Sequence, residues 1–159
     1  MVEVFVKDVV NKGETMGFLN ISFKVVLFLW LLLCSWQDIK DQQISIILIA
    51  AGFVALFVVS LIQGQLALWE RIAGVGIGFI LLILNKVTRG QIGIGDGLIF
   101  CVIGISLGFI VNSILLIYSL FIAAIFSGLY MIIKKANRKT TIPFVPFIFI
   151  ASMGVYFSE

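Results

Sequence analysis

Long runs of apolar residues are the feature that most limits what this chain can fold into. One run, from Val25 to Leu33, contains no polar residue except the indole nitrogen of Trp30, and similar runs recur along the chain. Apolar residues make up 62% of the 159 residues and charged residues 12%, whereas soluble domains have about 45–50% and about 25%. Because a spanning helix needs roughly 20 apolar residues, six would use roughly 120 residues. The sequence therefore predicts an all-α integral membrane protein, a bundle of about six transmembrane helices.

The expected helices leave only short connections between them. We place them at residues 18–38, 44–62, 69–87, 96–105, 110–133 and 143–156, with a tight turn at 106–108. Five spans are the main alternative, because residues 98–133 are almost continuously apolar. Residues 1–17 have no basic region typical of a cleaved signal peptide. They are expected to form an N-terminal interfacial or extracytoplasmic segment, as helix or strand, before a membrane domain over residues 18–159.

Lysine and arginine residues predict the orientation of the bundle, because basic residues favour cytoplasmic loops. The loops after the first, third and fifth helices contain seven of them, and the opposite side contains four. This distribution places both termini outside a multi-pass cell-membrane protein. The seven are Lys40, Lys86, Arg89, Lys134, Lys135, Arg138 and Lys139, and the four are Lys7, Lys12, Lys24 and Arg71, the last of these at the membrane interface.

The composition excludes several kinds of chemistry. The chain has no histidine, so neither a Ser-His-Asp triad nor a histidine-ligated metal site can be built. Cys34 and Cys101 both lie in apolar runs and are expected to be small core residues. A net charge of +3 provides no basic face for nucleic acid. We therefore expect no cofactor, no metal and no nucleic-acid partner.

Two carboxylates are the candidates for chemistry. Asp38 ends the first expected helix and Asp96 opens the fourth, so both lie at the cytoplasmic end of the bundle. An ionisable group at membrane depth is costly and indicates function. Two close carboxylates share one proton, so the ionised member can activate water while the protonated one polarises a peptide carbonyl. This pattern fits an aspartic peptidase that uses neither metal nor covalent intermediate.

Other interpretations of these acids remain open. Asp96 could cap the N-terminus of its helix, and Asp38 could be an ordinary interfacial residue beside Lys40. Asp41 is interpreted as a loop charge, and Glu70 as an interfacial ion. A different class of protein, a small multi-span transporter or ion channel using intramembrane carboxylates, is the alternative to a peptidase. An inactive assembly factor with the same fold is a third possibility.

The glycines divide into structural and site-shaping candidates. Gly74 and Gly78 form a small-xxx-small pair that permits close helix packing. Gly93 and Gly95 do not form a dinucleotide fingerprint, because no strand precedes them. They are expected to let a substrate backbone approach Asp96 closely.

Three segments together resemble the type IV prepilin peptidase family, the GxGD-type membrane aspartic peptidases that include preflagellin peptidases. Gln37-Asp38-Ile39-Lys40 through Ile44 is similar to the first aspartate motif of the family. Gly93-Ile94-Gly95-Asp96 is similar to the GxGD motif, and Ile142-Pro143-Phe144-Val145-Pro146-Phe147 to the proline-containing start of the last helix. The three segments occur in the order that the family has.

The resemblance implies a membrane-embedded aspartic endopeptidase that removes the leader peptide of prepilin-like proteins at the cytoplasmic membrane face. It implies that Asp38 and Asp96 are the catalytic pair and that Gly93 and Gly95 shape the site. The expected partners are prepilin-like substrates, of the kind used in type IV pili and protein secretion, and the lipid bilayer.

Two positions depart from the family pattern. Ser45 replaces a frequent proline after the first motif, and Leu98 replaces a frequent lysine after the second aspartate. These departures concern the leader sequence that is preferred rather than the reaction. N-methyltransferase activity is not expected, because the paired cysteine motifs of bifunctional relatives do not occur here.

Overall fold

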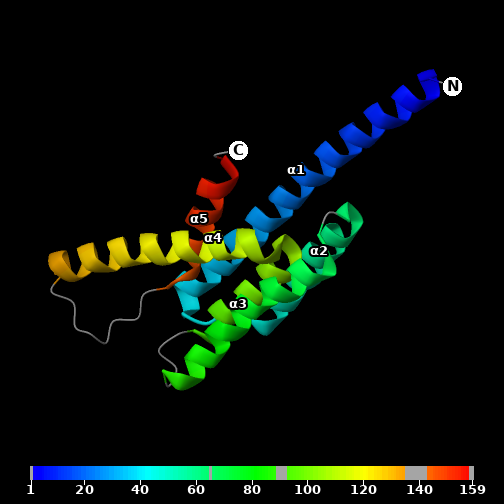
Figure 1. Cartoon of the computed structure of the whole chain (residues 1–159). Helices are drawn as coiled ribbons and strands as arrows, with labels where there is room; N and C mark the ends of the chain where they lie inside the picture. The colour runs from blue at the N-terminus through cyan, green and yellow to red at the C-terminus, as the bar shows by residue number, and fades with distance from the viewer. Residues whose placement is uncertain (1, 65, 89–92, 135–142, 158–159) are drawn as a thin grey trace.

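The chain is all-helical throughout the part that the structure, a computed structural model, describes (Figure 1). The described residues are 2–64, 66–88, 93–134 and 143–157. They form five helices and no strand, which confirms the predicted fold class. The helices are α1 (Val2–Asp41), α2 (Ile46–Gln63), α3 (Leu68–Val87), α4 (Ile94–Lys134) and α5 (Val145–Phe157).

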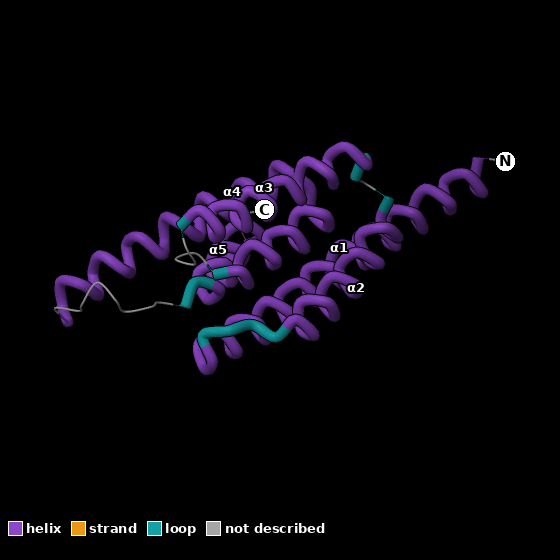
Figure 2. The backbone as a smooth tube through the Cα atoms, turned by 90° about the horizontal axis from the view of Figure 1, so that it is seen from below, coloured by secondary structure: helices purple, strands orange, loops and turns teal. Residues whose placement is uncertain are grey.

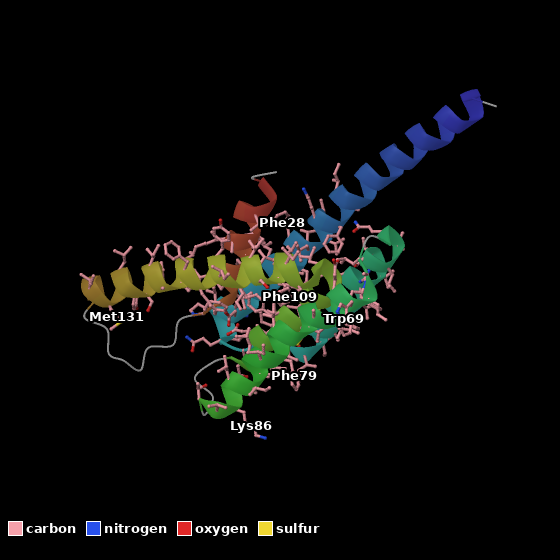
Figure 3. The ribbon with its side chains drawn as sticks, in the orientation of Figure 1. Phe28, Trp69, Phe79, Lys86, Phe109 and Met131 are labelled. Atoms are coloured by element: carbon pink, nitrogen blue, oxygen red, sulfur yellow. The ribbon has the colours of Figure 1, made fainter. Side chains whose placement is uncertain are left out.

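Length and hydropathy make this bundle a multi-pass membrane protein. Among the described residues, four helices are long and apolar enough to cross a membrane, and α5 adds a shorter apolar one. Trp69 and Lys86 project from opposite ends of α3 (Figure 3), as residues at the two membrane interfaces should. The apolar side chains on the outside of the helices therefore face lipid rather than water.

The helix α4 reverses direction at Gly108. Gly108 has φ 83° and ψ 178°, a backbone conformation that only glycine adopts without strain. The Asn112 side chain donates a hydrogen bond of 3.0 Å to the carbonyl oxygen of Phe100, which a straight helix would hold far away. The predicted turn at residues 106–108 is therefore present. The two parts of α4, residues 94–107 and 109–134, correspond to the fourth and fifth helices expected from the sequence.

The first part of α4 packs against α3 at backbone distance. A Cβ atom on Gly74 would collide with the backbone of Gly104, and one on Gly104 with the backbone of Gly74. Asn112 also donates a hydrogen bond of 2.9 Å to the carbonyl oxygen of Gly74, so it ties α3 to both parts of α4. A Cβ on Gly78 would collide with Cys101 in the same way. The close packing predicted for Gly74 and Gly78 is confirmed.

The helices α1 and α2 lie side by side (Figure 2). They can pack closely because the Trp30 ring of α1 fits over Gly52 of α2. The Trp30 indole of α1 occupies the space that a side chain at Gly52 of α2 would need. Its N–H donates a hydrogen bond of 2.9 Å to the carbonyl oxygen of Leu48. This bond satisfies the one polar atom of a buried ring.

Arg71, in the first turn of α3, is buried inside the bundle, which the sequence did not predict; its depth at the membrane interface stays a prediction. Its side chain is only 6% exposed. The guanidinium donates hydrogen bonds to Ser60 Oγ (2.9 Å), the carbonyl oxygen of Ser60 (3.0 Å) and that of Ile105 (2.9 Å). These carbonyls lie at the C-terminal ends of α2 and of the first part of α4, where helices carry partial negative charge and lack backbone partners. Arg71 thereby caps two helices at once, while Glu70 is exposed as expected.

The N-terminal segment is helical, a choice that the sequence left open. Residues 2–17 continue into the membrane part of α1 as one helix and project away from the other helices (Figure 1). The interfacial position predicted for residues 1–17 stays a prediction.

The close contact between α3 and α4 predicts how alanine substitutions of two glycines in α3 change the stability of the protein. Gly74→Ala should lower the free energy of unfolding by roughly 1–3 kcal/mol, because the new methyl group has no space. Gly76 is the matched control, since no atom lies within 4 Å of its potential Cβ. Gly76→Ala should leave stability unchanged or raise it by roughly 0.5–1 kcal/mol. Thermal unfolding in detergent, followed by circular dichroism, measures both; equal losses would contradict the packing described here.

Candidate functional site

Asp38 lies in the last turn of α1 and is buried at the start of α5. Its side chain is 8% exposed, and Oδ2 accepts a hydrogen bond of 3.0 Å from the N–H of Val145. The backbone of Phe144 also donates to this carboxylate. The first N–H groups of a helix have no partner within the helix, so the carboxylate of Asp38 fills that role for α5. The alternative that Asp38 is an ordinary interfacial residue is therefore wrong.

Asp96 is the third residue of α4 and is half-buried. The helix begins at Ile94, so Asp96 does not occupy the N-cap position itself. Its carboxylate instead reaches back and accepts a hydrogen bond from the backbone N–H of Gly93, as the acidic residue of a capping box does. A Cβ atom on Gly93 would lie 2.7 Å from Asp96 Oδ2. Glycine at position 93 thus makes room for the carboxylate of Asp96.

The two carboxylates come together at one end of the bundle. Asp38 accepts a hydrogen bond from the N–H of Val145, and the ring of the adjacent Phe144 lies 6.5 Å from the ring of Phe100, which is one turn beyond Asp96 on α4. The two carboxylates are brought there by the C-terminal end of α1 and the N-terminal end of α4, with the N-terminus of α5 against Asp38. Two carboxylates that come close together in an apolar site favour a state in which the pair holds one proton. The pair can therefore both accept and donate a proton.

The connection between α1 and α2 is fixed beside this pair. Gln37 Oε1 accepts a hydrogen bond of 3.0 Å from the N–H of Ser45. Ile44 packs over Gly95, where an added Cβ would lie 2.8 Å from Ile44 Cδ1. Gly95 therefore admits the α1–α2 connection, while Gly93 is exposed.

The remaining acids lie apart from the pair. Asp41 is exposed beyond the end of the buried part of α1. Glu70 lies near Gly108, at the opposite end of the first part of α4 from Asp96. Among the described residues, no group of three His, Cys, Asp or Glu side chains is arranged to hold a metal ion. Arg89, Lys135, Arg138 and Lys139, which contribute to the predicted orientation, lie outside the described residues.

Three features of the site were not predicted from the residues. The N–H of Val145 is a backbone group and carries no side-chain signal. Gln37 and Ile44 lie within or next to the first aspartate segment, so proximity in sequence was the signal available for them. The last helix begins at Val145 instead of position 143, which puts Pro146 rather than Pro143 in its first turn.

The fold and the site define a class: a multi-pass helical membrane protein with two carboxylates, Asp38 and Asp96, gathered at one end of its bundle. Residues 25–132 match the type IV leader peptidase family. The chain belongs to this family, and the matched residues include both Asp38 and Asp96. No curated protein and no solved structure gives a significant match.

The hydrogen bond from the N–H of Val145 to Asp38 predicts how substitutions of Asp38 change the stability of the protein. Asp38→Asn retains an oxygen that can accept from the N–H of Val145, whereas Asp38→Ala leaves that buried N–H unpaired. We expect Asp38→Asn to be more stable than Asp38→Ala by roughly 1–3 kcal/mol. Thermal unfolding in detergent compares the two directly. Equal stabilities would show that the bond does not hold α5 in place.

Proposed function

We propose that this chain is an aspartic endopeptidase that removes the leader peptide of prepilin-like proteins at the cytoplasmic face of the cell membrane. The observation that carries the proposal is the placement of Asp38 and Asp96 at the same end of the bundle, where Phe144 beside Asp38 packs against Phe100, one turn beyond Asp96. Both aspartates lie within the segment that matches the leader peptidase family. The family gives the class of reaction, and the carboxylate pair gives a chemical means to perform it.

In the proposed reaction the pair acts as one unit that holds a single proton. The ionised carboxylate takes a proton from a water molecule, and that water attacks the carbonyl carbon of the scissile peptide bond. The protonated carboxyl donates a hydrogen bond to the carbonyl oxygen, where negative charge develops. When the resulting tetrahedral intermediate collapses, the C–N bond breaks and the carboxyl group that took the proton from water passes it to the leaving amine. The roles are assigned to the pair and not to either residue, because coupled groups titrate together.

The surroundings of the pair suit this reaction. The N–H of Val145 holds the Asp38 carboxylate in one orientation, and Gly93 gives the Asp96 carboxylate its space. Pre-positioned groups of this kind lower the entropic part of a barrier. In this proposal an extended peptide reaches Asp96 past Gly93, the exposed residue next to α4.

A transporter or ion channel is less well supported. Proton relays and ion pathways place ionisable groups along the membrane depth, near the midplane. Here the interacting carboxylates gather at one end, and the buried cation Arg71 is engaged by helix carbonyls. The cytoplasmic location of that end is part of the proposal and rests on the distribution of lysine and arginine in the sequence.

Substitution of single carboxylates tests the proposal. Asp38→Asn and Asp96→Asn should each abolish cleavage of a prepilin-like peptide, because each leaves the pair without a shared proton between two carboxyls. Asp41→Asn is the matched control: it makes the same change three residues from Asp38, at an exposed position, and should cleave at the rate of the unchanged protein. Cleavage is measured by mass spectrometry of the released leader.

Each variant must also stay folded, which circular dichroism in detergent verifies. Full cleavage by the Asp38→Asn, Asp96→Asn double variant would overturn the proposal. Equal loss of activity in Asp41→Asn would show that the effect is not specific to the pair.

The shared proton predicts how the rate depends on pH. As pH rises, the proton leaves the pair, the donor to the peptide carbonyl is lost, and cleavage should slow. As pH falls, both carboxyls become protonated and the base is lost, so the profile of kcat/KM should be bell-shaped. A rate that stays constant into alkaline solution, while the protein remains folded, would contradict the proposed proton count.

A further inference from the structure

The beginning of α5 is fixed to the end of α1 through Phe144, the residue directly before α5. The carbonyl oxygen of Phe144 accepts hydrogen bonds from the N–H groups of Phe147 (3.0 Å) and Ile148 (3.4 Å), as that of a helix N-cap does. The backbone N–H groups of Phe144 and Val145 both donate to the carboxylate of Asp38. The N-cap of α5 and the side chain of Asp38 therefore hold each other in place.

The ring of Phe144 makes a separate contact with the helix that carries Asp96. Its centroid lies 6.5 Å from that of the Phe100 ring, with an angle of 35° between the two planes. Phe100 is completely buried. It follows Asp96 by four residues, and residues four apart lie on the same face of an α-helix. The ring of Phe144 thus packs against the face of α4 that carries Asp96.

A second aromatic contact holds the start of α5 against the other part of α4. The ring of Phe147 lies 6.5 Å from that of Phe144 and 5.3 Å from that of Phe126, between centroids. Aromatic pairs at such distances stabilise packing beyond the area that they bury. The start of α5 is therefore held by Phe144 on residues 94–107 of α4 and by Phe147 on residues 109–134.

We propose that Phe144 is a positioning residue of the carboxylate pair, whose ring, packed on α4, sets the distance between Asp38 and Asp96. This inference rests on the proposed function. The backbone of Phe144 is bonded to one acid, and its ring packs one turn beyond the other. Without the ring, α5 can shift along α4 and take Asp38 with it. A misplacement of roughly 1 Å between reacting groups can cost about 100-fold in rate.

Replacement of the ring tests the inference through cleavage of a prepilin-like peptide. Phe144→Leu retains the backbone donors to Asp38 and removes the contact between the rings. We expect kcat to fall about tenfold or more with KM unchanged, because the change affects the alignment of the pair and not the binding of the peptide. Phe144→Tyr keeps the ring and should retain kcat within about threefold. An equal loss in both variants would contradict the inference.

Phe149→Leu is the matched control. Phe149 is half-buried and belongs to the same end of the chain as Phe144, but its ring packs edge-on against Phe28 of α1, 6.3 Å away between centroids. This variant should cleave at the rate of the unchanged protein. Circular dichroism in detergent verifies that each variant is folded. Equal losses of kcat in Phe144→Leu and Phe149→Leu would show that the effect comes from general loosening of α5, and would overturn the inference.

A double substitution tests whether the contact with Phe100 is the one that matters. Phe100→Leu removes the same contact from the side of α4, so it should lower kcat as Phe144→Leu does. Both substitutions together should lower kcat by no more than about twofold beyond the larger single effect, because they remove one shared contact. Multiplication of the two separate effects would contradict the inference. If Phe100→Leu does not fold, the comparison of Phe144→Leu with Phe144→Tyr and Phe149→Leu decides.

The mutual influence of the two aspartates is measured without any cleavage. Carboxyl ¹³C NMR in detergent follows the titration of the Asp38 side chain before and after Asp96→Asn. When Phe144→Leu is present, Asp96→Asn should shift the Asp38 titration by less than about half as much as in the unchanged protein, because the acids lie farther apart. When Phe149→Leu is present, the shift should be the same as in the unchanged protein.

The two proposals fail in distinguishable ways. If the unchanged protein cleaves no peptide, the proposed peptidase function fails, while the NMR titrations still decide whether Phe144 sets the distance between the acids. If the protein cleaves the peptide but Phe144→Leu behaves as Phe149→Leu does in both measurements, the peptidase function stands and Phe144 does not position the pair.

Discussion

Two carboxylates at the same end of an apolar helix bundle, Asp38 at the end of α1 and Asp96 at the start of α4, are the constraint on which the rest of this structure depends. Bringing Asp38 and Asp96 together in such a bundle costs free energy unless the two acids share a proton or accept hydrogen bonds from backbone donors. The structure supplies donors from different elements: the start of α5 for Asp38, and Gly93 for Asp96. The ends of three helices are therefore held together at one place, an arrangement that is typical of a functional site rather than of a hydrophobic core.

The scaffold that holds this place relies on close backbone contacts. Gly74 and Gly104 bring α3 and the first part of α4 together, and the reversal at Gly108 lets Asn112 bind both. Arg71 joins the C-terminal ends of α2 and of the first part of α4, away from the carboxylates. These contacts, which lie away from the carboxylates, fix the position of α4 along its neighbouring helices. They therefore also fix where Asp96 lies relative to Asp38.

Much of this arrangement could be predicted from side-chain patterns, and what could not depends on backbone groups. The apolar runs predicted the helices, and the spacing of the glycines predicted the close contact at Gly74. The two isolated carboxylates were the basis for predicting the candidate pair. The burial of Arg71 was missed because its partners are carbonyl oxygens, which every residue has, while the adjacent Glu70 indicated an interface. The bond from Val145 to Asp38 was missed for the same reason. Backbone partners depend on tertiary packing, and a single sequence does not encode them in a readable pattern.

The central claim is that Asp38 and Asp96 act as one coupled pair, and carboxyl ¹³C NMR of the labelled protein in detergent measures this directly. The two side-chain carbons should titrate in two joint steps, and replacing either residue with asparagine should change the titration of the other. Asp41→Asn should leave both curves as they are. If each aspartate titrates independently, and neither responds to the loss of the other, the pair does not exist and the mechanism built on it is wrong.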